Sequence, residues 1–113
     1  MRINENEMQQ IRAILEQTTR LTFPFIANKQ KKEKMLRDER YRIENKIEKI
    51  LMEYTQMRKE FEERKDEIWN SSVDISVDKF KSLPDKLQLN SFYFQEVMHE
   101  YVEEIINLLC EEE

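Results

Sequence analysis

A heptad repeat in the middle of the sequence strongly constrains what this chain can fold into. With residue 40 at the first heptad position, eight of ten seam positions are apolar or aromatic, and their spacing alternates between three and four without a slip. This period keeps one face of a helix apolar, as in coiled coils and helical bundles. We therefore predict one long helix over residues 28–70 whose seam forms a helix–helix interface. The seam residues are Leu36, Arg40, Ile43, Ile47, Ile50, Tyr54, Met57, Phe61, Arg64 and Ile68.

Three residues depart from the pattern of a simple two-stranded coiled coil. Arg40 and Arg64 place charges in the seam, which lowers stability but can fix the register or orientation of helices. Leu51 lies beside the seam and widens the apolar stripe, which favours packing against more than one helix. Two geometries remain open. Either the shorter helices fold back on the long helix as a three-helix bundle, or the long helices dimerise and the shorter helices dock partners at the ends.

Shorter segments flank this long helix. Asn4 and Glu7 have the spacing of a helix N-cap and its N3 acid, which predicts a first helix over residues 5–20. Pro24 removes a backbone donor and predicts a corner. Asn70, Ser71 and Ser72 compete for their own backbone, so we expect the long helix to end there. An irregular connector is predicted over 71–90, a last helix over 91–110 and a fraying acidic tail over 111–113.

The predicted last helix is the most apolar segment of the sequence. Its apolar face covers well over a third of the helix circumference, so it must be buried on the long helix or in a partner. We therefore predict a second interface from the residues of this face. They are Phe94, Val97, Met98, Tyr101, Val102, Ile105, Leu108 and Leu109.

The composition argues against an enzyme. The sequence contains no glycine, so a phosphate-cradling P-loop, a dinucleotide-binding turn and a calcium-binding EF-hand loop are excluded. One histidine, His99, and one cysteine, Cys110, are too few for a zinc set or an intrachain disulfide. Adjacent carboxylates such as Glu103 and Glu104 fit a solvated helix face better than acid–base chemistry. We predict no catalytic residues, no cofactor, no metal and no small-molecule substrate.

The charge is distributed unevenly along the chain. Residues 28–49 contain nine Lys or Arg against five acids, whereas residues 95–113 contain seven Glu and no Lys or Arg. A basic segment of this kind can bind a nucleic acid, an acidic lipid or an acidic protein surface. The interspersed acids dilute its field, so a solvated face is the favoured interpretation. The candidate anion-binding residues are Lys29, Lys31, Lys32, Lys34 and Arg37.

Together these features predict a single all-α domain over residues 1–113, packed as an elongated helical bundle. The function we expect is that of a non-catalytic interaction or scaffold subunit, which forms a homodimer or joins a larger complex. The alternative is a small nucleic-acid-associated protein that uses residues 29–42. No apolar run is long enough to cross a membrane and no secretory signal is present, so we expect a soluble intracellular protein. The sequence leaves cytoplasm and nucleus open.

Overall fold

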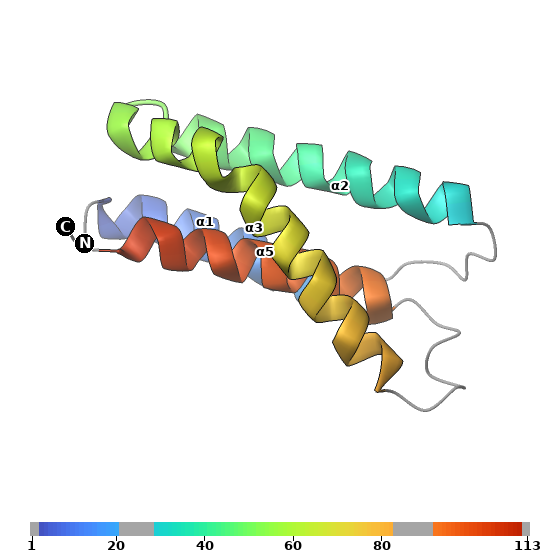
Figure 1. The fold of residues 1–113 in the computed structure, drawn as a ribbon. Helices are drawn as coiled ribbons and strands as arrows, with labels where there is room; N and C mark the ends of the chain where they lie inside the picture. Colours follow the sequence, from blue (N-terminus) through green and yellow to red (C-terminus); the bar gives the residue numbers. More distant parts are fainter. Residues whose placement is uncertain (1–2, 21–28, 83–91, 112–113) are drawn as a thin grey trace.

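The described part of the chain is an antiparallel bundle of helices (Figure 1). The computed structural model describes residues 3–20, 29–82 and 92–111, and these residues form the helices α1 (Glu5–Arg20), α2 (Lys29–Ile50), α3 (Thr55–Lys81) and α5 (Phe92–Cys110). Successive helices run in opposite directions, and α5 packs against all three of the others. The molecule measures 44 × 22 × 21 Å. The predicted all-α, elongated bundle is confirmed.

α1 begins at the cap that the sequence predicts. The Asn4 side-chain Oδ1 accepts a hydrogen bond from the Glu7 backbone N–H at 2.9 Å. The reciprocal hydrogen bond of a capping box, from the Asn4 backbone N–H to the Glu7 carboxylate, is not formed. Instead the Tyr54 hydroxyl accepts from the Asn4 N–H at 3.3 Å and donates to Glu7 Oε2 at 3.2 Å. The start of α1 is thereby tied to the turn between α2 and α3.

The prediction of one long helix over 28–70 is wrong, because the chain turns back on itself between Ile50 and Thr55. The Leu51 N–H still bonds to Ile47 O at 2.9 Å, and the Tyr54 N–H then closes the turn on Leu51 O at 2.9 Å. Folding back lets the two halves of the seam reach one common core, and Leu51 is itself fully buried. A single extended helix would leave each half exposed unless another chain covered it.

The irregular connector predicted from residue 71 is also wrong at its start. α3 continues without a break to Lys81, and Ser82 bonds back to Asp78 O and Lys79 O at 3.2 Å. Ser72 does not stop the helix, because its buried hydroxyl donates to Ile68 O at 2.8 Å within the same helix. Tertiary burial of this face thus outweighs the weak local preference of serine. The Pro24 corner and connector residues 83–90 lie outside the described residues.

The core lies along α5. Nine of its residues, Phe94, Val97, Met98, Tyr101, Val102, Ile105, Ile106, Leu108 and Leu109, are buried. The other helices contribute Met8, Ile11 and Ile14 from α1, Ile43 and Ile47 from α2, and Met57, Phe61 and Ile68 from α3. A helix with so broad an apolar face is stable only when that face is covered, which explains the central place of α5.

One buried group on α3 lacks a hydrogen bond. The Ser76 hydroxyl is buried and has no partner among the described residues. We expect Ser76→Ala to raise the free energy of unfolding by about 1 kcal/mol, because it removes an unsatisfied polar atom and improves helix propensity. The matched variant Ser72→Ala removes a bonded hydroxyl from the same helix face and should be close to neutral. Urea denaturation followed by circular dichroism measures both, and a destabilised Ser76→Ala protein would contradict the assignment.

Candidate functional site

The first half of α2 extends beyond the core. From Gln30 to Arg42 the structure gives no buried residue, and Ile43 is the first fully buried side chain among those described in this helix. Figure 1 shows α2 and α3 close together near the turn and well separated at their far ends. The basic segment predicted from the sequence is therefore displayed to solvent on one arm of this opening.

Polar side chains, rather than an apolar seam, join α2 to α3 where the two helices begin to separate. Arg40 Nε donates to Glu44 Oε1 at 2.6 Å, and Arg40 Nη2 reaches Asp66 Oδ1 on α3 at 2.5 Å. Glu44 is only 3% exposed, and the Tyr101 hydroxyl of α5 donates to its Oε1 at 2.6 Å. Lys65 Nζ lies 3.9 Å from Glu44 Oε2. One buried carboxylate thus connects three helices.

Aromatic rings complete this cluster. The Arg40 guanidinium lies 5.1 Å from the centroid of Trp69 and 5.8 Å from that of Tyr101. The two rings meet edge to face at 84°, with centroids 5.0 Å apart. A cation over two aromatic faces is attracted by both ring quadrupoles, so the rings and the carboxylates together fix the position of Arg40.

The environment shifts the acid–base equilibria of this cluster. Burial and the hydrogen bond to Glu44 raise the pKa of Tyr101, so its hydroxyl stays protonated and remains a donor. Burial acts to lower the pKa of Arg40, but its hydrogen bonds to Asp66, Tyr101 and Glu44 outweigh that effect and raise it. Both groups therefore keep one protonation state throughout the physiological range, which suits a structural role rather than proton transfer.

A second acidic pair bridges the same two helices nearer the turn. The hydrogen bond with Glu62, together with partial burial, raises the pKa of Glu48. The same hydrogen bond and the ammonium of Lys65 lower the pKa of Glu62. Lys65 lies 2.9 Å from Glu62 and 3.9 Å from Glu48, and its own pKa is raised, first by the hydrogen bond to Glu62. Ion pairs thus join α2 to α3 at two positions along their length, at Arg40–Asp66 and at Glu48–Lys65.

Above the Arg40 cluster lies an open groove of about 450 Å³ between the diverging helices. We call it the α2/α3 groove. Tyr41, Trp69 and Arg40 all line it, and Tyr41 is 57% exposed. Its wall is therefore both aromatic and cationic. The lining residues are Glu33, Leu36, Arg37, Arg40, Tyr41, Trp69 and Val73.

The structure distributes the predicted seam over this bundle. Ile43, Ile47, Met57, Phe61 and Ile68 are buried within the chain, and Leu36, Ile50 and Tyr54 pack partly buried against the same core. The Arg40 side chain is 18% exposed in the cluster, whereas Arg64 is 44% exposed and lies 3.6 Å from Glu111. In this chain most of the seam therefore forms internal contacts, and Leu36 and Arg40 alone also line the groove.

The predicted interface of the last helix is likewise internal. All eight of its residues, Phe94, Val97, Met98, Tyr101, Val102, Ile105, Leu108 and Leu109, are buried in the bundle. Of the candidate anion-binding residues, Lys31, Lys34 and Arg37 are exposed and Lys32 is half-buried, while the Lys29 side chain lies outside the described part. No ion pair joins Lys34 or Arg37 to another described residue.

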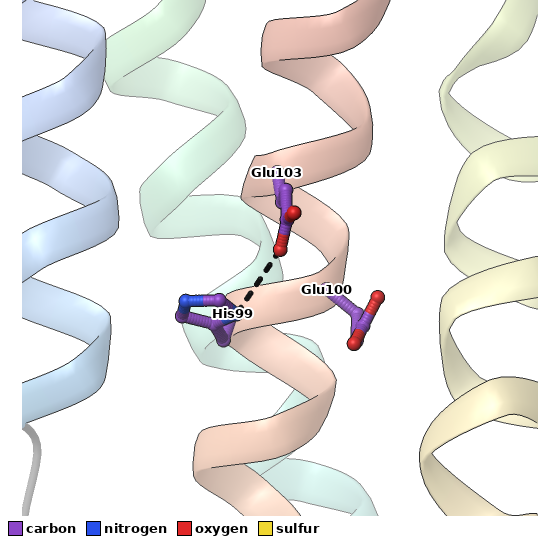
Figure 2. Close-up of side chains that lie close together, drawn as sticks. All are labelled: His99, Glu100 and Glu103. Carbon is purple, nitrogen blue, oxygen red and sulfur yellow. Dashed lines mark ion pairs between the residues drawn. The ribbon is translucent and has the colours of Figure 1, made fainter.

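A small group of possible metal ligands lies on α5. One ligand atom each of His99, Glu100 and Glu103 falls within 4.8 Å of the others. His99 Nδ1 lies 3.4 Å from Glu103 Oε2 on the same helix, while Glu100 extends toward α3 (Figure 2). There Glu100 forms an ion pair with Lys79 of α3, which also lies 3.7 Å from Glu96. His99 and Glu103 thus contact each other within α5, whereas Glu100 and Glu96 join α5 to α3 through Lys79.

Sequence reasoning identified part of this site and missed the rest. Arg40 and the basic segment were singled out, because a charge in an apolar seam is visible in the pattern. Asp66 and Trp69 were missed, since their contacts with Arg40 depend on the hairpin that brings residues 26 and 29 positions apart together. Glu44 was missed because its burial depends on α5, which supplies Tyr101. An acid four residues after a seam arginine, as Glu44 follows Arg40, was the one signal available in the sequence.

Two further findings bear on function. Among the described residues, no helix has the length and apolar character needed to cross a membrane. No protein-family model, no curated protein and no solved structure matches this chain.

Proposed function

We propose that this protein is a non-catalytic interaction protein that binds an acidic, amphipathic helix of a partner protein in the α2/α3 groove. The single observation that carries the proposal is the groove wall, where apolar, aromatic and cationic side chains from two helices meet around an open volume of about 450 Å³. Amphipathic helices bind in grooves of this kind through apolar residues spaced three or four apart.

The apolar part of the groove supplies the anchor. Leu36 and Val73 are only partly buried where they pack against the core, and Tyr41, which lines the same groove, is 57% exposed. Aromatic side chains contribute much of the free energy of protein interfaces, because they bury large areas with little loss of side-chain entropy. A leucine or phenylalanine of the partner fits this wall.

The cationic residues at the groove determine which charge the partner helix should carry. Arg37 lines the groove and Lys34 lies on the same helix; both are exposed, and neither forms an ion pair with any described residue. Arg40 also lines the groove, but it is already held by Glu44 and Asp66 and is not a free cation. Charge complementarity speeds association and excludes like-charged partners, so these groups favour glutamates and aspartates on the flanks of the bound helix.

Nucleic-acid binding by residues 29–42 is the alternative, and the same basic segment supports it. Single strands bind by stacking bases on aromatic rings along a cationic path. Here Arg40 covers Trp69, which leaves Tyr41 as the exposed ring of the groove. Glu33 and Asp38 are also exposed on the same half of α2. These features favour a protein partner over a nucleic acid.

Trp69 provides a direct test, since it is the sole tryptophan of the sequence and lines the groove. A synthetic helical peptide of about four turns, with leucines on one face and glutamates on its flanks, is titrated while Trp69 fluorescence is recorded. We expect saturable binding. Arg37→Glu should weaken it at least about tenfold through charge repulsion, and Tyr41→Ala by about tenfold through loss of the anchor.

Two control variants distinguish binding in the groove from non-specific binding of the peptide elsewhere on the surface. Lys59→Glu changes an exposed cation of α3 outside the groove, and Met52→Ala removes an apolar side chain that is 68% exposed at the turn. Neither should alter the affinity for the peptide. Equal binding by the Arg37→Glu protein would contradict the proposal. Preference for a single-stranded oligonucleotide, with affinity that falls steeply with salt, would support the alternative instead.

A further inference from the structure

The residues of the turn between α2 and α3 are compatible with a continuous helix. Leu51, Met52 and Glu53 are good helix formers, and no residue of the described chain has a positive φ that would require a special turn residue. Tyr54 stands at the N-cap of α3 with φ −103° and ψ 70°, and its side chain makes no capping hydrogen bond there. Nothing in the local sequence therefore opposes a helix through these four positions.

The heptad repeat gives a second, independent reason. Its spacing runs unbroken from Leu36 through the turn to Ile68, although the hairpin interrupts the helix between Ile50 and Thr55. A hairpin needs no such continuity, because its two arms are separate helices whose apolar faces can have any relative phase. A continuous helix does require it, since a slip would rotate one half of the seam away from its partner.

We propose that the chain forms a domain-swapped dimer with a second copy of itself, in which α2 and α3 fuse into one helix. In each half of this dimer, α1 and α2 of one chain pack against α3 and α5 of the other. The contacts that now join the two pairs of helices, such as Arg40 with Asp66 and Glu44 with Tyr101, then re-form between chains. Exchange of identical elements in this way requires no new complementary surface.

The balance between the two forms depends on the turn. In the monomer, Leu51 is buried and the Tyr54 hydroxyl holds the start of α1. In the dimer, residues 51–54 gain helical hydrogen bonds, and residues 29–81 form a helix of about 80 Å. Since most other contacts are common to both forms, protein concentration and the helix propensity of the turn should decide which form dominates.

A distance across the turn distinguishes the swapped dimer from any other dimer. Asp38 and Glu67 are exposed, and they flank the Arg40–Asp66 contact that holds the hairpin closed. Asp38→Cys and Glu67→Cys are introduced on a Cys110→Ser background and spin-labelled. Doubly labelled chain is refolded at millimolar concentration with excess unlabelled chain, and the dimer is isolated by chromatography with light scattering. The distance within one labelled chain is then about 44 Å in a continuous helix and far shorter in the hairpin.

A substitution in the turn tests the same proposal through the equilibrium between monomer and dimer. Glu53→Gly is tolerated in a turn but disfavoured in a helix, so it should lower the dimer association constant roughly thirtyfold, because both chains pay the helical cost. Glu63→Gly is the matched control, since Glu63 is exposed and helical in both forms and its replacement should leave the association constant unchanged.

The proposal is overturned by three results. These are a monomer at every concentration after refolding, a dimer with the short label distance, or a Glu53→Gly protein that associates as well as Glu63→Gly. A dimer with the long distance that the turn glycine weakens supports it. These outcomes are separate from those of the groove titration, so either proposal can fail alone.

Discussion

Replacing Glu44 by alanine is expected to lower the free energy of unfolding by about 3 kcal/mol. Glu44 is 3% exposed and accepts hydrogen bonds from both Arg40 and Tyr101. Its removal leaves the buried Tyr101 hydroxyl without its acceptor and deprives Arg40 of one of its two carboxylates. Removing one member of a buried charged cluster is costly, because the groups left behind remain desolvated. Urea denaturation followed by circular dichroism measures the change.

Two further variants show what this cluster contributes. Glu63→Ala removes an exposed acid of α3 and should change the stability by less than about 0.5 kcal/mol. Replacing the cluster as a whole, by Arg40→Met, Glu44→Leu and Tyr101→Phe together, should come close to the stability of the natural chain, since no buried charge is then left unpaired. If Glu44→Ala proved as stable as Glu63→Ala, the buried network would have no structural role.

Ile47→Asp is expected to unfold the protein. Ile47 is fully buried in the core that α2 shares with the other helices, and a carboxylate there has neither water nor a partner. The expected loss, above about 4 kcal/mol, approaches the whole stability of a typical domain. Far-ultraviolet circular dichroism and a thermal scan should show loss of helix and of the cooperative transition.

The matched variant is Met52→Asp. Met52 is apolar like Ile47 and lies five residues later in the same sequence region, but it is 68% exposed at the turn. Its replacement should leave the helical content and the cooperative transition intact. The opposite pattern, a folded Ile47→Asp protein that merely fails to associate, would show that the seam faces another chain and not its own core.

The apolar periodicity determined the helical content and much of the core. The first helix and its Asn4 cap follow from residues four or fewer positions apart, and such local interactions depend little on the remaining chain. The broad apolar face of α5 likewise indicated that this helix must be enclosed, and it is central in the bundle. Both features could be predicted because they follow from the sequence of one helix alone.

The turn at residues 51–54 could not be predicted, because nothing local marks it. It contains neither glycine nor proline, and helix formers occupy its first positions. The chain turns there because burial of Leu51, Ile47 and Phe61 in one core outweighs the helical hydrogen bonds lost over a few residues. Ser72 shows the converse, since burial carries α3 through a segment with weak helical preference.

The groove and the charged cluster beneath it were decided by tertiary structure. The sequence alone placed the basic residues on one helical segment and the apolar residues on one face, because these patterns depend on spacing of three or four residues. Only the hairpin brings Arg40 to Asp66 and Trp69, and only the divergence of α2 from α3 opens the space beside Tyr41. Contacts between distant residues depend on the path of the chain. Here the free energy of burial, and not any local signal, determines that path.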